Sequence, residues 1–274
     1  MTGITVIKCG GHAAVDPAAI CADVAELYRE GRRVVLAHGG SAEIEHLAGR
    51  LGVPLRRLVS PDGVSARYTD AATLEVVTMA LTAGVKPRLS TALAGHGVPS
   101  VGLTGLDGVL RARRKPVHRA IVDGRQILVR DDHSGRVTSV DGELLTGLLD
   151  AGRVPVVSPP ALAEDGAPVN ADADRAAAAV AAALEAATLL LLTGAPGVLA
   201  DAADERSVLP VYRVPATGAP ADVSGGMRLK LVAAREALRA GVPRVLVADG
   251  RRPRPVLAAL SGEATRIVLS EEKD

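Results

Sequence analysis

The sequence predicts an α/β fold built on a parallel sheet. Two short runs of β-branched and aliphatic residues, 4–7 and 33–37, have the composition of buried strands. Each run is followed by a Gly-Gly turn and then by apolar residues at helical spacing. Strand and helix patterns alternate through the first half of the chain, and repeated strand–helix units imply parallel strands joined by right-handed crossovers.

The first unit is suited to holding a phosphate group. Lys8 ends the strand, and Gly10 and Gly11 follow it. A lysine there is costly to bury unless an anion meets it, and the glycines let the backbone approach a ligand closely. Asp16 and Pro17 fit the N-cap and first position of a helix, whose N-terminus favours an anion. From this stretch alone, a surface lysine before an ordinary turn remains the alternative, since the motif is neither a Walker A loop nor G-x-G-x-x-G.

The second unit repeats this pattern. His38, Gly39, Gly40 and Ser41 follow its strand, and Ser41 is predicted to cap the helix that comes next. Both Gly-Gly turns would then lie at the carboxyl edge of the parallel sheet. Because open α/β folds bind ligands at that edge, the sequence predicts a binding site there.

Composition excludes several classes of function. The chain has 274 residues, enough for two lobes, and its net charge of +1 gives no overall attraction to nucleic acid or membrane. Signal-peptide and transmembrane patterns are not found, so a cytoplasmic location is expected. Cys9 and Cys21 are too few for a disulfide framework or a metal cluster. Phe and Trp are absent, so base-stacking platforms are not expected and an adenine pocket would have to be aliphatic.

An arginine precedes a long helix in the next stretch. Residues 60–70 contain Pro, Gly and Ser and are predicted to form a loop that carries Arg67. Thr69 or Asp70 can cap a helix that runs to about Gly84. The planar fork of Arg67 suits a carboxylate ligand, although a solvated loop arginine is the alternative.

A basic segment interrupts the strand–helix pattern. It contains five cations and no acid: Arg111, Arg113, Arg114, Lys115 and Arg119. The runs 120–122 and 126–129 flank Asp123-Gly124, which predicts a β-hairpin that leaves the sheet. A cluster of this kind in a nearly neutral chain is either a solvated patch or a docking site.

Polar residues also gather at helix starts in the second half. Asn170, Asp172 and Asp174 precede an Ala-rich helix predicted to end near Ala187, where they could cap the helix or form part of a site. A strand at 189–193 leads into a Gly-Pro turn at 194–199. Residues 224–230 open another helix, and two strands are predicted at 244–249 and 266–269.

Together these pieces resemble the amino-acid kinase family and, within it, the acetylglutamate kinases. The resemblance implies a three-layer αβα sandwich with a mainly parallel sheet and two lobes. Residues 1–168 would form the acceptor lobe, with a basic hairpin near 111–130, and residues 169–274 the ATP lobe. The matching segments occur in family order over nearly the whole chain: residues 7–11, 38–41, Arg67 with 69–70, 170–174, 193–198 and 225–230.

The resemblance also implies roles for individual residues. Lys8 and Lys230 would neutralise the transferring phosphoryl group, and Asp174 would position them. The acceptor would be bound by Gly39, Gly40, Ser41, Arg67 and Asn170. ATP, with its Mg²⁺ and without a protein-bound metal, would contact Gly10, Gly11, Thr193, Gly197, Val198, Leu199, Gly226 and Met227.

Some departures resemble a sister group instead. Ser41 stands where acetylglutamate kinases often have glycine, and Asp172 where they often have asparagine. The 61–63 loop with Ser65 and the 105–108 turn resemble kinases that act on 2-aminoadipate or glutamate attached to an acidic amino-group carrier protein of the LysW type. The basic segment, with Arg113, Arg114 and Lys115, could then dock the carrier. A homodimer is also implied.

The sequence therefore predicts a kinase that forms an acyl phosphate on a carrier-bound acidic amino acid. Free N-acetylglutamate kinase and a non-catalytic nucleotide sensor are the alternatives. The pathway, whether it leads to lysine, arginine or a specialised metabolite, is left open.

Overall fold

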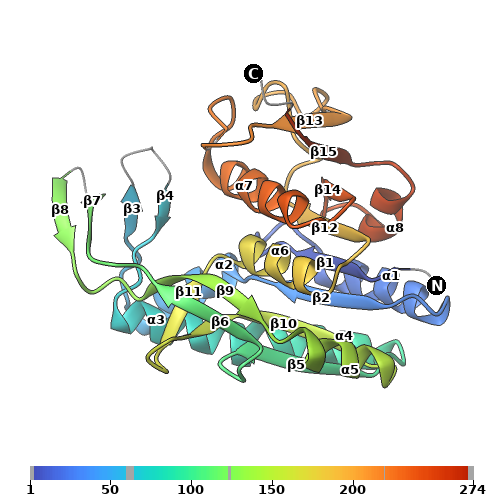
Figure 1. Cartoon of the computed structure of the whole chain (residues 1–274), viewed down its shortest axis with the longest axis horizontal. Helices are drawn as coiled ribbons and strands as arrows, with labels where there is room; N and C mark the ends of the chain where they lie inside the picture. Colours follow the sequence, from blue (N-terminus) through green and yellow to red (C-terminus); the bar gives the residue numbers. More distant parts are fainter. Residues whose placement is uncertain (1–2, 60–64, 123–124, 219, 271–274) are drawn as a thin grey trace.

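The computed structural model describes residues 3–59, 65–122, 125–218 and 220–270. Eleven strands in this part of the chain form one mixed sheet (Figure 1). In sheet order they are β11 (Pro168–Ala171), β9 (Ser134–Val140), β6 (Leu110–Arg114), β10 (Val154–Ala163), β2 (Val34–His38), β1 (Thr5–Cys9), β12 (Thr188–Thr193), β14 (Val245–Asp249), β15 (Thr265–Leu269) and β13 (Val211–Val214), with β5 (Ser100–Gly105) paired to β10.

The centre of the sheet is parallel, as predicted. Strands β10, β2, β1, β12 and β14 all run in the same direction. Lys8 on β1 lies opposite Ala37 on one neighbouring strand and Leu191 on the other. Both Gly-Gly turns and the turn after β12 therefore leave the sheet side by side at its carboxyl edge. Antiparallel pairs occur toward the edges, between β14 and β15 and between β6 and β9.

Helices cover both faces of the sheet, which confirms the three-layer sandwich. The helices α1 (Pro17–Arg29), α4 (Lys86–Gly95) and α8 (Pro255–Leu260) pack on one face, and α5 (Gly142–Asp150), α6 (Ala173–Ala183) and α7 (Gly225–Arg239) on the other (Figure 1). Alternate strand residues face opposite layers. Ile7 belongs to the core of the first layer and Val6 to the core of the second.

A smaller helical unit extends the first layer. It consists of α2 (Ser41–Leu51), α3 (Ala71–Met79) and the π-helical turn η1 (Ala80–Val85) around a core that includes Ile44, Val77 and Leu81. The helix predicted to end near Gly84 instead continues through η1 and α4 to Gly95. The helix is unbroken at this junction, because Val85 and Lys86 both keep right-handed helical φ and ψ angles. Pro87, which has no backbone N–H to donate, lies just after the π turn.

Two predicted caps have different outcomes. Asp16 caps α1 as predicted, accepting hydrogen bonds from Ala18 N and Ala19 N at 2.9 and 3.2 Å. Ser41 does not cap α2, because Gly40 occupies the N-cap position and Ser41 is already helical. The Ser41 hydroxyl donates instead to the carbonyl of Gly11 at 2.7 Å and so ties the two Gly-Gly turns together.

A second, four-stranded sheet stands apart from the sandwich at one end of the molecule (Figure 1). Its order is β4 (Ser65–Arg67), β3 (Arg57–Val59), β7 (His118–Val122) and β8 (Arg125–Val129). The β7–β8 pair confirms the predicted hairpin, although its Asp123-Gly124 turn and the 61–63 loop lie outside the described residues.

Two predictions about this region need correction. Arg67 lies on strand β4, not in a loop, because residues 65–67 pair with β3. The cations at 111–114 belong to β6 of the main sheet, where they pair with β9, so the hairpin itself carries only part of the basic segment. Within the described residues, none of the helices combines the length and apolarity needed to cross a bilayer.

The buried ring of His38 gives a prediction about stability. Its Nδ1–H donates to the Gly39 carbonyl at 3.0 Å, and its buried Nε2 has no partner within the described chain. Burial lowers the pKa of His38 to about 4. The unfolded chain binds a proton near pH 6.5 while the folded chain does not, so the free energy of unfolding falls as the pH drops from 6.5 toward 4, by about 3 kcal/mol.

Chemical denaturation at pH 7 and pH 5 checks this expectation. His38→Gln removes the titrating group and is expected to lose less stability over that interval than the wild type does. Equal losses in the two proteins would show that His38 remains solvated enough to titrate normally.

Candidate active site

Three buried charged side chains meet at the carboxyl edge of the sheet. Lys8 comes from β1, Asp174 from the first turn of α6, and Lys230 from α7. The Nζ atoms of Lys8 and Lys230 lie 2.8 and 2.9 Å from the same oxygen, Asp174 Oδ1. The structure thus brings together the three residues that the family resemblance grouped, although they lie far apart in the sequence.

The charges of this trio do not cancel. Burial alone would raise the pKa of Asp174, but the two ammonium groups outweigh burial and hold that pKa well below its ordinary value. Burial also lowers the pKa of Lys230, and the neighbouring charge of Lys8 adds to that effect. Two cations therefore share one carboxylate, and the excess positive charge is best compensated by an anionic ligand.

The two Gly-Gly turns pack directly against each other beside the trio. A Cβ atom at Gly11 would lie 2.6 Å from the backbone nitrogens of both Gly40 and Ser41. A Cβ at Gly10 would lie 2.7 Å from the carbonyl oxygen of Leu192. Such distances exclude any side chain at either position, so glycine is required here for close backbone approach.

A cavity of about 360 Å³ opens next to the trio. Lys8 and Asp174 line it, and Gly39, Gly40 and Ser41 form part of its wall. The cavity is rich in cations, and its lining also includes Arg57, Arg67, Lys115, Asn170 and Arg175. Predicted acceptor residues thus share one cavity, together with Arg57 and Arg175, which the sequence did not single out.

Asn170 is held by a polar network behind the cavity wall. Its Nδ2 donates to Thr69 Oγ1 at 3.1 Å. The Thr69 backbone N–H and the Ser134 hydroxyl both donate to Asp132 Oδ1, at 3.2 and 2.6 Å. Asp132 and Ser134 were not among the predicted site residues, because nothing in the local sequence pattern indicated strand β9 or its pairing with β11.

The Asp172 carboxylate forms a local hydrogen bond at the start of α6. It caps α6 by accepting the Arg175 backbone N–H at 2.9 Å. Burial and the nearby charge of Asp174 raise the pKa of Asp172. Arg175 in turn forms a two-pronged pair with Glu236 on α7, with distances of 2.9 and 2.6 Å, which fixes the two helices that carry Asp174 and Lys230.

The predicted ATP residues come from several elements, of which β12 lies next to β1 on the side away from β2. Thr193 ends β12, and Gly226 and Met227 lie in the first turn of α7. Val198 N donates to Thr265 Oγ1 at 3.0 Å, and a Cβ at Gly197 would lie 2.7 Å from that oxygen. Apart from Gly11, these residues do not line the cavity.

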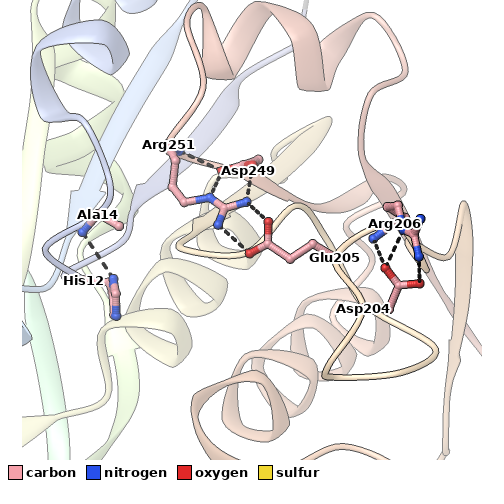
Figure 2. Close-up of polar contacts among 7 residues, drawn as sticks. All are labelled: His12, Ala14, Asp204, Glu205, Arg206, Asp249 and Arg251. Carbon is pink, nitrogen blue, oxygen red and sulfur yellow. Dashed lines mark hydrogen bonds and ion pairs between the residues drawn. The ribbon is translucent and has the colours of Figure 1, made fainter.

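Arg251 links the loop that carries Glu205 to Asp249, the last residue of strand β14 (Figure 2). Its Nε and Nη2 atoms donate hydrogen bonds to the Asp249 carboxylate at 2.9 and 2.8 Å. Its Nη1 and Nη2 atoms donate to the Glu205 carboxylate at 2.6 and 3.0 Å. The His12 ring packs closely against Gly194, where a Cβ would lie only 2.9 Å from the His12 Nδ1 atom. Its Nδ1 accepts the Ala14 N–H at 3.2 Å, which orients the ring.

Comparison with known proteins places this geometry in a family. The model of the amino acid kinase family matches residues 3–249. This chain belongs to the amino acid kinase family. The [LysW]-aminoadipate kinase of Thermus thermophilus is 40% identical over 95% of this chain and 98% of its own length. The acetylglutamate kinase of Symbiobacterium thermophilum is 38% identical over 96% of this chain and 90% of its own.

The fold comparison agrees with the sequence comparison. The solved structure of the N-acetylglutamate synthase from Neisseria gonorrhoeae, complexed with coenzyme A and N-acetyl-glutamate, matches with a TM-score of 0.77 at 26% identity. The match covers 98% of this chain and 60% of the synthase chain. As a member of the amino acid kinase family, the chain is a kinase, and a kinase of this family uses ATP.

The trio gives a prediction for turnover. Lys8→Ala and Lys230→Ala should each lower kcat by at least about a hundredfold and change the KM for ATP much less, because their charges matter most while the phosphoryl group transfers. Steady-state kinetics with saturating acceptor measures both constants. A variant that keeps nearly normal kcat would remove that lysine from the catalytic group.

The Arg251 contacts give a second prediction. Glu205→Gln weakens the ion pair with Arg251 that holds this loop next to the predicted ATP residues. The KM for ATP should therefore rise roughly threefold, the scale expected for the loss of an exposed ion pair. Asp204→Asn is the matched control, because Asp204 pairs with Arg206 within the same loop and does not reach Arg251 (Figure 2). Equal KM values in the two variants would show that this tie does not shape the nucleotide site.

Proposed function

We propose that this kinase phosphorylates the side-chain carboxylate of an acidic amino acid whose amino group is attached to a carrier protein. The acceptor would be of the 2-aminoadipate or glutamate type, and the product an acyl phosphate. The observation that carries the proposal is the pair of lysines on Asp174 Oδ1, next to a cationic cavity that contains Arg67 and Asn170. The name of the Thermus thermophilus relative supports it.

The residues of the trio account for the chemistry. An acceptor carboxylate is ionised at neutral pH and needs no general base. One of its oxygens attacks the γ-phosphorus of ATP, the bond to the β-phosphate bridging oxygen breaks, and ADP leaves with that electron pair. The main obstacle is repulsion between anions, roughly 4 kcal/mol per charge pair at about 4 Å. Lys8 and Lys230 offset this repulsion, and Asp174 keeps their ammonium groups in place.

Mg²⁺ would enter with the nucleotide. Asp174 is engaged by both lysines and Asp172 by the N-terminus of α6. Within the described residues, no group of three or more His, Cys, Asp or Glu side chains is arranged to hold a metal. The donor set therefore fits an ion held mainly by phosphate oxygens, where it would neutralise charge on the β- and γ-phosphates.

The number of cations that line the cavity supports a carrier-bound substrate. Arg67 and Asn170 would bind the single α-carboxylate of a free N-acetylated acceptor. Arg57 and Lys115 add two further cations to the same cavity, which suggests an acceptor with additional negative charge nearby. Free N-acetylglutamate is the second candidate acceptor, and the relative in Symbiobacterium thermophilum supports it. A non-catalytic sensor would not need both lysines of the trio, since it stabilises no transferring phosphoryl group.

The predicted docking cations differ in their surroundings. Lys115 lines the cavity and is available to a bound acceptor or its carrier. Arg113 already lies 3.2 Å from Glu164, and Arg114 lies 3.9 Å from Asp165 while contacting His133. A carrier that used Arg113 or Arg114 would have to replace these contacts. The ATP lobe at 169–274, the homodimer and the cytoplasmic location stay predictions.

Formation of a hydroxamate from the acyl phosphate tests the proposal. With ATP and Mg²⁺, the wild type should yield hydroxamate with carrier-linked 2-aminoadipate or glutamate at a higher kcat/KM than with free N-acetylglutamate. Arg67→Ala should raise the acceptor KM roughly thirtyfold, since losing a charge-assisted contact costs about 2 kcal/mol. Absence of acyl phosphate with every acidic acceptor, despite ATP binding, would favour a sensor.

A further inference from the structure

The four-stranded sheet has two faces with different properties. In an antiparallel sheet, residues directly opposite each other on neighbouring strands share a face. Arg57 lies opposite Arg67, Val59 lies opposite both Ser65 and Ile121, and Arg119 lies opposite Leu128. One face therefore carries Arg57, Val59, Ser65, Arg67, Arg119, Ile121, Gln126 and Leu128, and we call it the open face.

The other face is packed. Leu58, Tyr68, Ala120 and Val129 form a small buried cluster there. This cluster explains why the sheet can stand apart from the sandwich. It also means that the open face is not needed for the sheet's own core, although its side chains include two large apolar groups.

The open face continues the wall of the active-site cavity. Arg57, Ser65 and Arg67 belong to both. From β4 the face extends across β3 and β7 to β8, about 14 Å away at the usual strand spacing. That distance exceeds the reach of a free acidic amino acid bound at Arg67, so a ligand covering the whole face must be larger than the acceptor alone.

The chemistry of the open face fits an acidic polypeptide. Arg57 and Arg67 lie directly opposite each other, an arrangement that is unfavourable for like charges unless an anion joins them. No acidic side chain belongs to the described part of this face. Arg57 is oriented by donating to Ser65 Oγ at 2.8 Å, and Arg67 has a carboxylate near it in Glu45, an exposed residue of α2.

Apolar side chains adjoin these cations. Ile121 is 42% exposed and Leu128 is 49% exposed, and exposed Arg119 lies directly opposite Leu128. Cations speed the association of an acidic partner, while buried apolar contacts slow its dissociation. The combination is typical of a protein-binding surface rather than of a solvated patch.

We propose that the open face docks the acidic carrier polypeptide and delivers its attached acceptor to the cavity at Arg57 and Arg67. This inference rests on the proposed function, and it assigns the carrier to Arg119, Ile121 and Leu128 rather than to Arg113 and Arg114. The carrier lies across β7 and β8, and its acceptor-bearing end enters between β3–β4 and Lys115.

The β7–β8 hairpin supplies matched controls for a test. Arg119→Glu and Leu128→Glu alter the open face. Arg125→Glu and Ile127→Glu make the same changes on neighbouring exposed residues that belong to the other face. The measurement is kcat/KM for carrier-linked acceptor and for free N-acetylated acceptor, whose ratio is insensitive to partial loss of active protein.

The ratio of kcat/KM values should fall about tenfold for Arg119→Glu and for Leu128→Glu, and stay at the wild-type value for Arg125→Glu and Ile127→Glu. The wild-type KM for carrier-linked acceptor should also rise with added salt. An unchanged ratio in the open-face variants, or equal changes in the control variants, would overturn the docking assignment while leaving the kinase activity intact. If the wild type phosphorylated free acceptor only, the proposed function itself would be wrong.

Discussion

The contact of two lysines with one buried carboxylate oxygen is the constraint on which this architecture depends. Lys8 and Lys230 lie near opposite ends of the chain, and Asp174 lies on a third element. They meet because β1 pairs with β12 in the middle of the sheet and because α6 and α7 pack on the same face. Burying three charges with a net positive charge is costly, and an anionic ligand would offset that cost.

Sequence patterns predicted those parts of the fold that are determined by interactions between residues close together in the sequence. The strand–Lys–Gly-Gly–helix unit, the capping by Asp16 and the β7–β8 hairpin each depend on residues close in sequence, and all three are present. The predicted Ser41 cap was wrong because the helix begins one residue earlier than expected, with Gly40 as its N-cap. The Ser41 hydroxyl instead donates to the Gly11 carbonyl, which the packing of the two turns brings within reach.

Other features depend on contacts between distant segments. Residues 65–67 form a strand because β3 and β7 lie beside them, and the isolated sequence favours a loop. Asp132 and Ser134 orient Asn170 through Thr69, which precedes them by more than sixty residues. The family resemblance could group Lys8, Asp174 and Lys230, but residue periodicity could not, and the presence of Arg57 in the cavity follows only from strand register.

The close packing of the two Gly-Gly turns has a consequence for how such an enzyme can change during evolution. In the proposed function the Gly10-Gly11 turn would contact the nucleotide and the Gly39-Gly40 turn the acceptor. The two turns touch through main-chain atoms, and a Cβ at Gly11 would lie 2.6 Å from the backbone nitrogens of Gly40 and Ser41. On this assignment, main-chain atoms would set the separation between donor and acceptor. Substitutions at Arg57, Arg67 or Lys115, which line the cavity, would then change the choice of acceptor without changing the distance over which the phosphoryl group is transferred.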